Sequence, residues 1–125
     1  MNKIAVVCDD DQTLTQIMQF VLSKQGFDVR TAENGNEALE LMKFSKPGLL
    51  LLDLEMPERD GFSVLREIAS GPDRPYTIIL SSHESQDIHD QAVALGAREV
   101  WVKPFNAAEL MTKISGLFEQ GRAAI

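Results

Sequence analysis

The sequence predicts an α/β domain in which a parallel sheet is covered by helices on both faces. Strand-like and helix-like segments alternate five times along the 125 residues. The central strand-like segment is a run of four leucines, Leu49 to Leu52, that ends at Asp53. A short, wholly apolar run bounded by turn formers is typical of a parallel strand that is buried on both faces. Each crossover between parallel strands then needs a helix, which gives a doubly wound arrangement.

Five short apolar segments have the composition of strands. The first, from Lys3 to Cys8, is continuous and runs directly into three aspartates. Turn-forming residues mark the ends of the central segment, because Pro47 and Gly48 precede it and Pro57 follows it. We expect strands over residues 3–8, 27–32, 49–53, 76–80 and 99–102.

Between these strands the apolar residues recur with the period of a helix. Asp11 and Asn106 stand where an N-cap is needed, and Gly26 stands where a C-cap is needed. We expect helices over residues 12–25, 36–44, 62–70, 85–95 and about 106–119. The side chains expected to face the core are Leu14, Ile17, Met18, Val21, Leu22, Ala38, Leu41, Met42, Phe62, Leu65, Ala69, Ile88, Ala92, Leu95, Leu110, Ile114 and Leu117.

The bulk composition indicates one globular domain. With 12 basic and 19 acidic residues the formal net charge is −7, which disfavours binding to nucleic acid or to an anionic membrane surface. The single cysteine, Cys8, has no partner for an intrachain disulfide, which fits a reducing compartment. Neither a signal peptide nor an apolar run of transmembrane length is visible, so we expect a cytoplasmic location. Residues 1–120 are expected to form the domain, and residues 121–125 a short C-terminal tail.

Polar side chains follow four of the five predicted strands. Asp9 and Asp10 come directly after the first strand, and Asp53 ends the third. Ser81 follows the fourth strand and Lys103 follows the fifth. Because the carboxyl ends of parallel strands meet at one edge of the sheet, where ligands bind in open α/β folds, we expect these side chains to converge.

Three carboxylates at one edge of a sheet repel one another, so they must take up protons or bind a cation. An all-oxygen set from Asp9, Asp10 and Asp53 suits a hard divalent ion such as Mg²⁺. Lys103 would add a positive charge opposite that ion, and Ser81 would add a hydroxyl. A carboxylate in these surroundings is set up to attack a phosphoryl group and to hold the charge that develops on its oxygens.

The order and spacing of these residues resemble the receiver domain of two-component response regulators, the group that includes chemotaxis regulators. The resemblance covers almost the whole chain. The spacing to Gly96 and Lys103 favours Ser81 over Ser82 as the hydroxyl residue. The matching segments are Val7-Cys8-Asp9-Asp10-Asp11, Leu52-Asp53-Leu54-Glu55-Met56-Pro57, Asp60-Gly61, Leu80-Ser81-Ser82, Gly96-Ala97 and Trp101-Val102-Lys103-Pro104-Phe105.

The resemblance implies a flavodoxin-like fold with the strand order 2-1-3-4-5. It implies that Asp53 accepts a phosphoryl group from a phosphohistidine of a histidine kinase or phosphotransfer protein. Asp10 and Asp53 would ligate Mg²⁺ directly, and Asp9 would do so through water. The backbone carbonyl of Glu55 would be a further ligand. Lys103 would pair with the phosphoryl group, Ser81 would turn to hydrogen-bond it, and the bond from Lys103 to Pro104 would be cis.

Three further positions bear on how such a site would work in this chain. The residue three positions before the lysine is commonly aromatic in the family, but here it is Val100. Trp101 follows it, and strand alternation should point Trp101 to the opposite face of the sheet. Glu55 and His83 occupy the positions, two beyond Asp53 and two beyond Ser81, that tune the phosphoryl lifetime in this family. We hypothesise that Glu55 modulates access of the hydrolytic water.

Two functions from different classes fit these residues. The first is a signalling switch that is not an enzyme beyond self-phosphorylation and self-dephosphorylation, and whose protein-binding surface changes when Asp53 is modified. The alternative is a Mg²⁺-dependent phosphohydrolase with an aspartyl-phosphate intermediate, which would want an aspartate where Glu55 stands. The expected partners of the switch are a histidine kinase or phosphotransfer protein and a downstream protein that the sequence does not name. Neither nucleic acid nor a membrane is expected to bind this domain, and the exposed fourth-helix face leaves a homodimer open.

Overall fold

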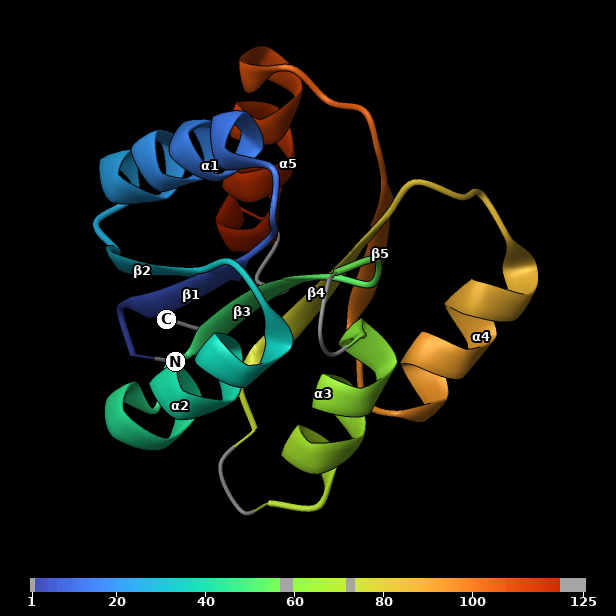
Figure 1. The fold of residues 1–125 in the computed structure, drawn as a ribbon. Helices are drawn as coiled ribbons and strands as arrows, with labels where there is room; N and C mark the ends of the chain where they lie inside the picture. Colours follow the sequence, from blue (N-terminus) through green and yellow to red (C-terminus); the bar gives the residue numbers. More distant parts are fainter. Residues whose placement is uncertain (1, 57–59, 72–73, 120–125) are drawn as a thin grey trace.

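The computed structural model describes residues 2–56, 60–71 and 74–119, in which five strands alternate with five helices (Figure 1). Every predicted element is present, and its ends lie within one residue of the prediction. Residues 57–59 and 72–73, which lie between predicted elements, and the predicted tail of residues 121–125 lie outside the described part. The elements are β1 (Ile4–Cys8), α1 (Gln12–Lys24), β2 (Asp28–Ala32), α2 (Gly35–Ser45), β3 (Leu49–Asp53), α3 (Gly61–Ala69), β4 (Tyr76–Ser81), α4 (Gln86–Ala94), β5 (Glu99–Val102) and α5 (Ala107–Glu119).

The strands form one parallel sheet in the order β2-β1-β3-β4-β5, which confirms the order implied by the resemblance. β3 is the central strand, and all of its residues are buried. Leu49 and Leu51 pack into the core on one face, and Leu50 and Leu52 pack into the core on the other. Because every strand runs in the same direction, their carboxyl ends lie at one edge of the sheet.

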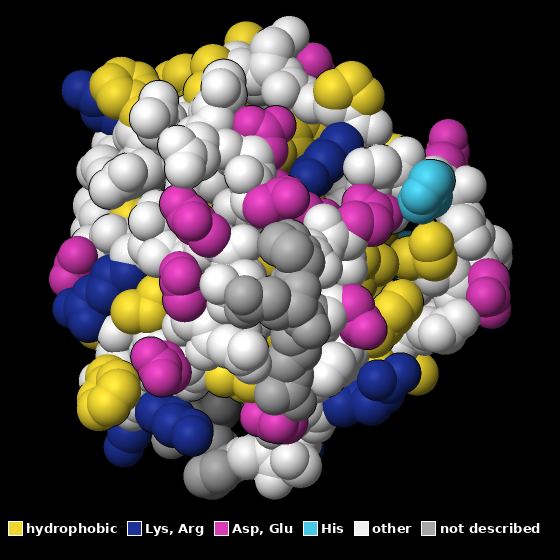
Figure 2. All heavy atoms as spheres, in the orientation of Figure 1, with side chains coloured by type: hydrophobic (Ala, Val, Ile, Leu, Met, Phe, Trp, Pro, Cys, Tyr) yellow, Lys and Arg dark blue, Asp and Glu magenta, His cyan; other side chains and the backbone are white. Residues whose placement is uncertain are grey.

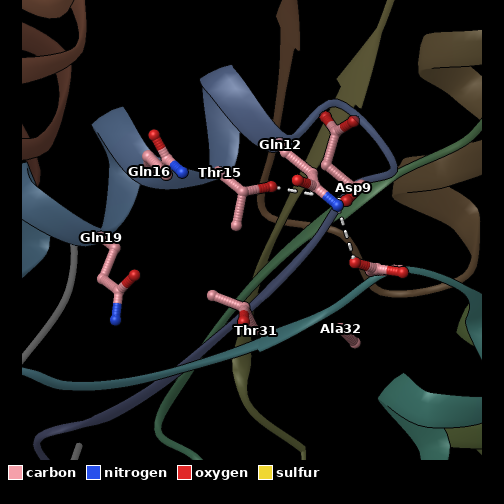
Figure 3. Close-up of a pocket in the computed structure, with 8 residues that line it drawn as sticks. Asp9, Gln12, Thr15, Gln16, Gln19, Thr31 and Ala32 are labelled. Carbon is pink, nitrogen blue, oxygen red and sulfur yellow. Dashed lines mark hydrogen bonds between the residues drawn. The ribbon is translucent and has the colours of Figure 1, made fainter.

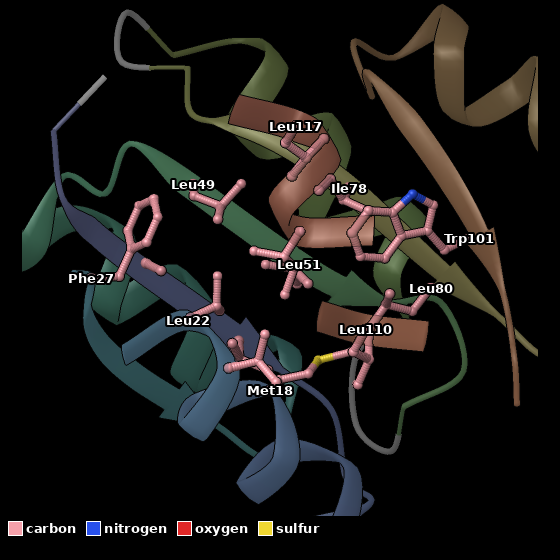
Figure 4. Packing of buried hydrophobic residues seen from close by; sticks show 14 of the residues in the cluster. Met18, Leu22, Phe27, Leu49, Leu51, Ile78, Leu80, Trp101, Leu110 and Leu117 are labelled. Atoms are coloured by element: carbon pink, nitrogen blue, oxygen red, sulfur yellow. The ribbon is translucent and has the colours of Figure 1, made fainter. Parts of the chain in front are cut away.

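Helices α1 and α5 cover one face of this sheet (Figure 1). Met18 and Leu22 of α1 share one core cluster with Leu51, Leu110 of α5 and Trp101 of β5, and Met18 points toward Leu110 (Figure 4). Trp101 is only 5% exposed and lies on the face opposite to Val100, as strand alternation predicts. Burial of large apolar side chains is what holds α1 and α5 against the sheet, at about 1.5–3 kcal/mol for each.

Helices α2, α3 and α4 cover the other face (Figure 1). Val100 is half-buried and packs against this second core, on the α4 side of β5. Of the residues in α4, only Ala92 is buried, whereas Ile88 is half-buried. α4 is therefore attached to the sheet by few apolar contacts.

The buried face of α3 differs from the prediction. Leu65 is buried as predicted, but Phe62 and Ala69 are only half-buried. Val64 and Ile68 complete the buried face instead. The predicted and the observed sets together make five apolar residues of α3, so two overlapping helix faces fit the period of 3.6 residues. Tertiary packing decides which of the two faces is buried.

The predicted N-caps of α1 and α5 are confirmed. The side chain of Asp11 accepts a hydrogen bond from the backbone N–H of Leu14 and caps α1. Asn106 Oδ1 accepts one from the N–H of Glu109 at 2.9 Å and caps α5. The C-cap of α1 is Gln25, one residue before the predicted Gly26, which follows it with φ of +90°, a left-handed conformation that glycine adopts without strain. Among the described residues, no helix is long and apolar enough to cross a membrane.

Candidate functional site

The carboxyl ends of the strands bring the predicted side chains together. Asp9 follows β1, Asp53 is the last residue of β3 and Ser81 is the last residue of β4. Lys103 follows β5, and its bond to Pro104 is cis, as the resemblance implies. Figure 2 shows acidic side chains gathered on the face of the molecule that contains this edge of the sheet. The structure therefore brings Asp9, Asp53 and Lys103 together at the edge of the sheet where the sequence predicts that they converge.

Three carboxylates form a cluster at this edge. Ligand oxygens of Asp9, Asp10 and Asp53 all lie within 4.8 Å of one another. Asp9 and Asp53 are each 1% exposed, whereas Asp10 is exposed to solvent. The cluster is thus open on one side and desolvated on the other.

The backbone around the cluster fixes the two buried carboxylates. Oδ1 of Asp9 accepts a hydrogen bond from the N–H of Asp11 at 2.9 Å, and Oδ1 of Asp53 accepts one from the N–H of Glu55 at 3.1 Å. The hydroxyl of Thr15 donates to the backbone oxygen of Asp9 at 3.4 Å (Figure 3). These bonds hold one oxygen of each carboxylate and leave the other oxygen for a charged partner.

A polar pocket of about 250 Å³ adjoins Asp9 between α1 and β2 (Figure 3). Gln12 of α1 donates to the carboxylate of Glu33 at 3.0 Å across this pocket. The remaining lining residues come from α1 and β2: Thr15, Gln16, Gln19, Thr31 and Ala32. The bond from Gln12 to Glu33 joins the start of α1 to the end of β2 and thereby supports the loop that carries Asp9.

Gly61 lets α3 begin directly against the end of β3. A Cβ atom at this position would lie 2.6 Å from the backbone oxygen of Asp53 and 2.8 Å from Cα of Leu54. Real Cβ atoms do not approach backbone so closely, so no other residue fits without a shift of the chain. The N–H of Gly61 donates to the oxygen of Leu54 at 3.1 Å, which fixes this close approach.

The ammonium of Lys103 lies between the two buried carboxylates. Its Nζ is 2.8 Å from Oδ2 of Asp9 and 3.3 Å from Oδ2 of Asp53. Burial alone would lower the pKa of Lys103, but hydrogen bonds and charge from Asp9 and Asp53 outweigh it and raise the pKa above its ordinary value. The side chain of Lys103 is therefore protonated, and positively charged, at neutral pH.

One ammonium does not neutralise this cluster. Burial and the charge of Asp9 raise the pKa of Asp53 to about 6, although Glu55 and Lys103 act in the opposite direction. Oδ2 of Asp9 is buried, and it shares the ammonium of Lys103 with Oδ2 of Asp53. Three carboxylates beside one ammonium keep an excess of negative charge, which a divalent cation would neutralise. The donor set therefore fits a hard divalent ion.

The hydroxyl of Ser81 is turned toward its own loop. Ser81 Oγ accepts a hydrogen bond from the N–H of His83 at 3.0 Å and donates to the backbone oxygen of His83 at 3.1 Å. Ser81 is fully buried, whereas Ser82 is exposed. Burial at the strand end agrees with the choice of Ser81 over Ser82, and its hydroxyl would have to rotate to reach a group on Asp53.

The side chain of Glu55 makes a contact that the sequence did not reveal. Its carboxylate accepts the backbone N–H of Ser82, at 3.4 Å for Oε1 and 3.3 Å for Oε2. Nε2 of His83 lies 3.8 Å from Oε1. The one signal in the sequence was that the two loops follow β3 and β4, which are neighbours in the predicted strand order.

A model of a known protein family matches most of the chain. The match spans residues 5–115 and is described as the response regulator receiver domain. This range contains all the side chains of the site described above.

Solved structures with the same fold agree with this match. The receiver domain of the Francisella response regulator 1452 is 28% identical, with a TM-score of 0.82, and covers 96% of this chain and 99% of its own. The phosphorylated cyanobacterial phytochrome response regulator RcpA is 26% identical, with a TM-score of 0.85. The match covers 100% of this chain and 97% of RcpA. The chemotaxis response regulator CheY4 of Vibrio cholerae shares the fold, with a TM-score of 0.84 at 23% identity. The match covers 94% of this chain and 100% of CheY4. The family match and the shared fold thus agree, and the chain belongs to the response regulator receiver domain family.

Proposed function

We propose that this chain is a phosphoacceptor in which Asp53 receives a phosphoryl group from a phosphohistidine of a histidine kinase or phosphotransfer protein. The observation that carries the proposal is the position of Asp53. It is a buried carboxylate at the end of the central strand, 3.3 Å from the ammonium of Lys103 and beside two further carboxylates. A structural role alone does not explain so costly an arrangement of like charges.

Asp10 and Asp53 would hold Mg²⁺ directly, Asp9 would hold it through water, and the backbone carbonyl of Glu55 would complete the protein ligands. The cluster of ligand oxygens within 4.8 Å, and its excess of negative charge over the single ammonium of Lys103, support this assignment. When bound, the ion neutralises charge on the carboxylates and on the oxygens of the transferring group.

The chain's own residues would divide the transfer among them. An oxygen of Asp53 attacks the phosphorus, so that an O–P bond forms as the N–P bond breaks and the histidine nitrogen leaves with the electron pair. Lys103, already poised between Asp9 and Asp53, balances the negative charge on the phosphoryl oxygens. Ser81 gives up its bonds to His83 and donates its hydroxyl to the phosphoryl group.

The proposed outcome is a signal rather than a released product. A phosphoryl group adds negative charge and acceptor oxygens at the strand ends, which shifts the equilibrium between two arrangements of the nearby surface. A downstream protein would read that change on α4, β5 and α5. The related cyanobacterial structure, described as phosphorylated, supports this use of the fold.

The test is incubation with acetyl phosphate and Mg²⁺ followed by intact-mass measurement. We expect the wild-type chain to gain the mass of one phosphoryl group, because Asp53 is activated by its surroundings. Asp53→Asn should gain none. Asp11→Asn is a matched control, since Asp11 caps α1 and an asparagine can keep that cap.

Two results would contradict the proposal. An adduct on Asp53→Asn would place the phosphoryl group elsewhere. Rapid multiple turnover of small phosphate esters without an adduct would favour the Mg²⁺-dependent phosphohydrolase.

A further inference from the structure

Glu55 contacts both the β3–α3 loop and the β4–α4 loop. Its backbone N–H donates to Oδ1 of Asp53 at 3.1 Å, which places it directly on the proposed phosphoacceptor. Its side-chain carboxylate accepts the N–H of Ser82 through both oxygens, at 3.3 and 3.4 Å. One residue therefore joins the carboxylate of Asp53 to the loop that follows β4.

The loop that Glu55 holds also determines where the hydroxyl of Ser81 points. Ser81 and His83 exchange two hydrogen bonds, from the N–H of His83 to Ser81 Oγ and from that hydroxyl to the backbone oxygen of His83. Ser82 lies between them, so its N–H fixes the middle of this turn. While the Glu55–Ser82 contact is intact, the turn keeps the hydroxyl of Ser81 directed at His83.

We propose that Glu55 is a positioning residue whose carboxylate holds the β4–α4 loop in the conformation in which the hydroxyl of Ser81 is bonded to His83. The contact opposes the rearrangement in which Ser81 would donate to a phosphoryl group. Its consequence for signalling rests on the proposed function, but the contact itself does not.

The contact between Glu55 and Ser82 is weak enough to break when the loop rearranges. The side chain of Glu55 is 40% exposed, that of His83 is 70% exposed, and the two hydrogen bonds to Ser82 are long. Hydrogen bonds of this kind contribute modestly to stability, so a competing interaction at the site can replace them.

α4 is the element that a shift of this loop would move. It begins at Gln86, with Ser85 as its N-cap, immediately after the residues that Glu55 holds. Only Ala92 of this helix is buried. Val100, where the family commonly has an aromatic residue, is half-buried on the same side of the sheet. The Glu55–Ser82 contact thus links the site to α4 without an aromatic residue at position 100 of β5.

The test is site-resolved amide hydrogen exchange, measured by NMR on the unphosphorylated chain. In Glu55→Ala the amides of Ser82 and His83 should exchange about fivefold faster, because their restraint is lost. Glu55→Gln should restore slow exchange, since its amide oxygen accepts the same N–H. Glu84→Ala removes an exposed carboxylate of the same loop and should leave these rates unchanged.

Wild-type exchange rates in Glu55→Ala, an equal acceleration in Glu84→Ala, or no restoration in Glu55→Gln would each overturn the inference. Failure of the proposed function is distinguished by acetyl phosphate. A chain that gains no phosphoryl group but shows the expected exchange rates retains the positioning role of Glu55 and refutes the phosphoacceptor role of Asp53.

Discussion

Asp53 is a carboxylate in surroundings that favour its neutral form. Burial and the charge of Asp9 raise its pKa from 3.8 to about 6, so the folded chain binds this proton more tightly than the unfolded chain does. The free energy of unfolding should therefore fall as the pH rises from about 4 to about 6 through this group. At neutral pH the charged Asp53 costs stability that a functional role must justify.

Replacement of Asp53 by asparagine should consequently stabilise the fold. We expect Asp53→Asn to raise the free energy of unfolding at neutral pH by about 1–2 kcal/mol in the absence of Mg²⁺, since the amide carries no charge. The gain should disappear at low pH, where Asp53 is protonated. Urea unfolding across this pH range measures both effects.

Glu84→Gln serves as the control for that measurement, because Glu84 is exposed and loses one negative charge in the same way. An equal gain in this variant would assign the effect to net charge. A loss of stability in Asp53→Asn at neutral pH would contradict the strained state of Asp53.

The residues of the site could be predicted from the sequence because each directly follows or ends a strand. Strand ends are positions in a pattern, and parallel strands bring them together whatever the side-chain rotamers are. The direction of the Ser81 hydroxyl and the contact from Glu55 to Ser82 could not be predicted this way. They depend on how two loops approach each other, and no periodic pattern encodes that approach.

At the scale of elements, the start of α3 depends on a glycine. A Cβ at Gly61 would collide with the backbone of Asp53 and Leu54, whereas a Cβ at Gly116 within α5 would meet nothing within 4 Å. We expect Gly61→Ala to lower the free energy of unfolding by about 1–3 kcal/mol through overpacking. Gly116→Ala should raise it by up to about 1 kcal/mol, because alanine is the better helix former.

Thermal or urea unfolding of the two variants provides the comparison. Both substitutions add the same methyl group, so a difference in sign isolates the close approach of α3 to β3. Equal effects of the two substitutions would show that the end of β3 tolerates a side chain at Gly61.

α4 is the least firmly packed of the helices whose buried residues can be compared. It buries only Ala92, whereas α1 buries four residues: Leu14, Met18, Val21 and Leu22. Native-state hydrogen exchange should therefore show amides in α4 exchanging about tenfold faster than those in α1. Equal protection of the two helices would mean that half-buried Ile88 and Val100 hold α4 more strongly than their exposure indicates.

The elements themselves could be predicted to within one residue because apolar period, turn formers and caps agree along the chain. The buried faces of the helices are less well predicted: Leu41 and Met42 of α2 are only half-buried, and α3 buries a different set from the one predicted. Phe62, Val64, Leu65, Ile68 and Ala69 are all apolar, so the sequence offers two overlapping faces. The close approach of Gly61 to β3 sets the rotation of the helix, and that is a tertiary contact rather than a local pattern.

At the scale of the whole molecule, the residues that stabilise the fold and the residues of the candidate site occupy different parts of the sheet. Two apolar cores on its opposite faces hold the fold together, and the carboxyl edge collects the charged groups. β1, β3 and β5 contribute Asp9, Asp53 and Lys103 from segments far apart in the chain. The proposed ion site therefore exists only in the folded protein, and Mg²⁺ should stabilise the fold by mass action.

Mg²⁺ titration followed by isothermal calorimetry tests this claim most directly. The folded wild-type chain should bind one ion in a saturable manner, and Asp53→Asn should bind it more weakly, whereas Asp11→Asn should match the wild type. Absence of saturable binding by the folded wild-type chain would contradict the assignment of Asp9, Asp10 and Asp53 to a Mg²⁺ site.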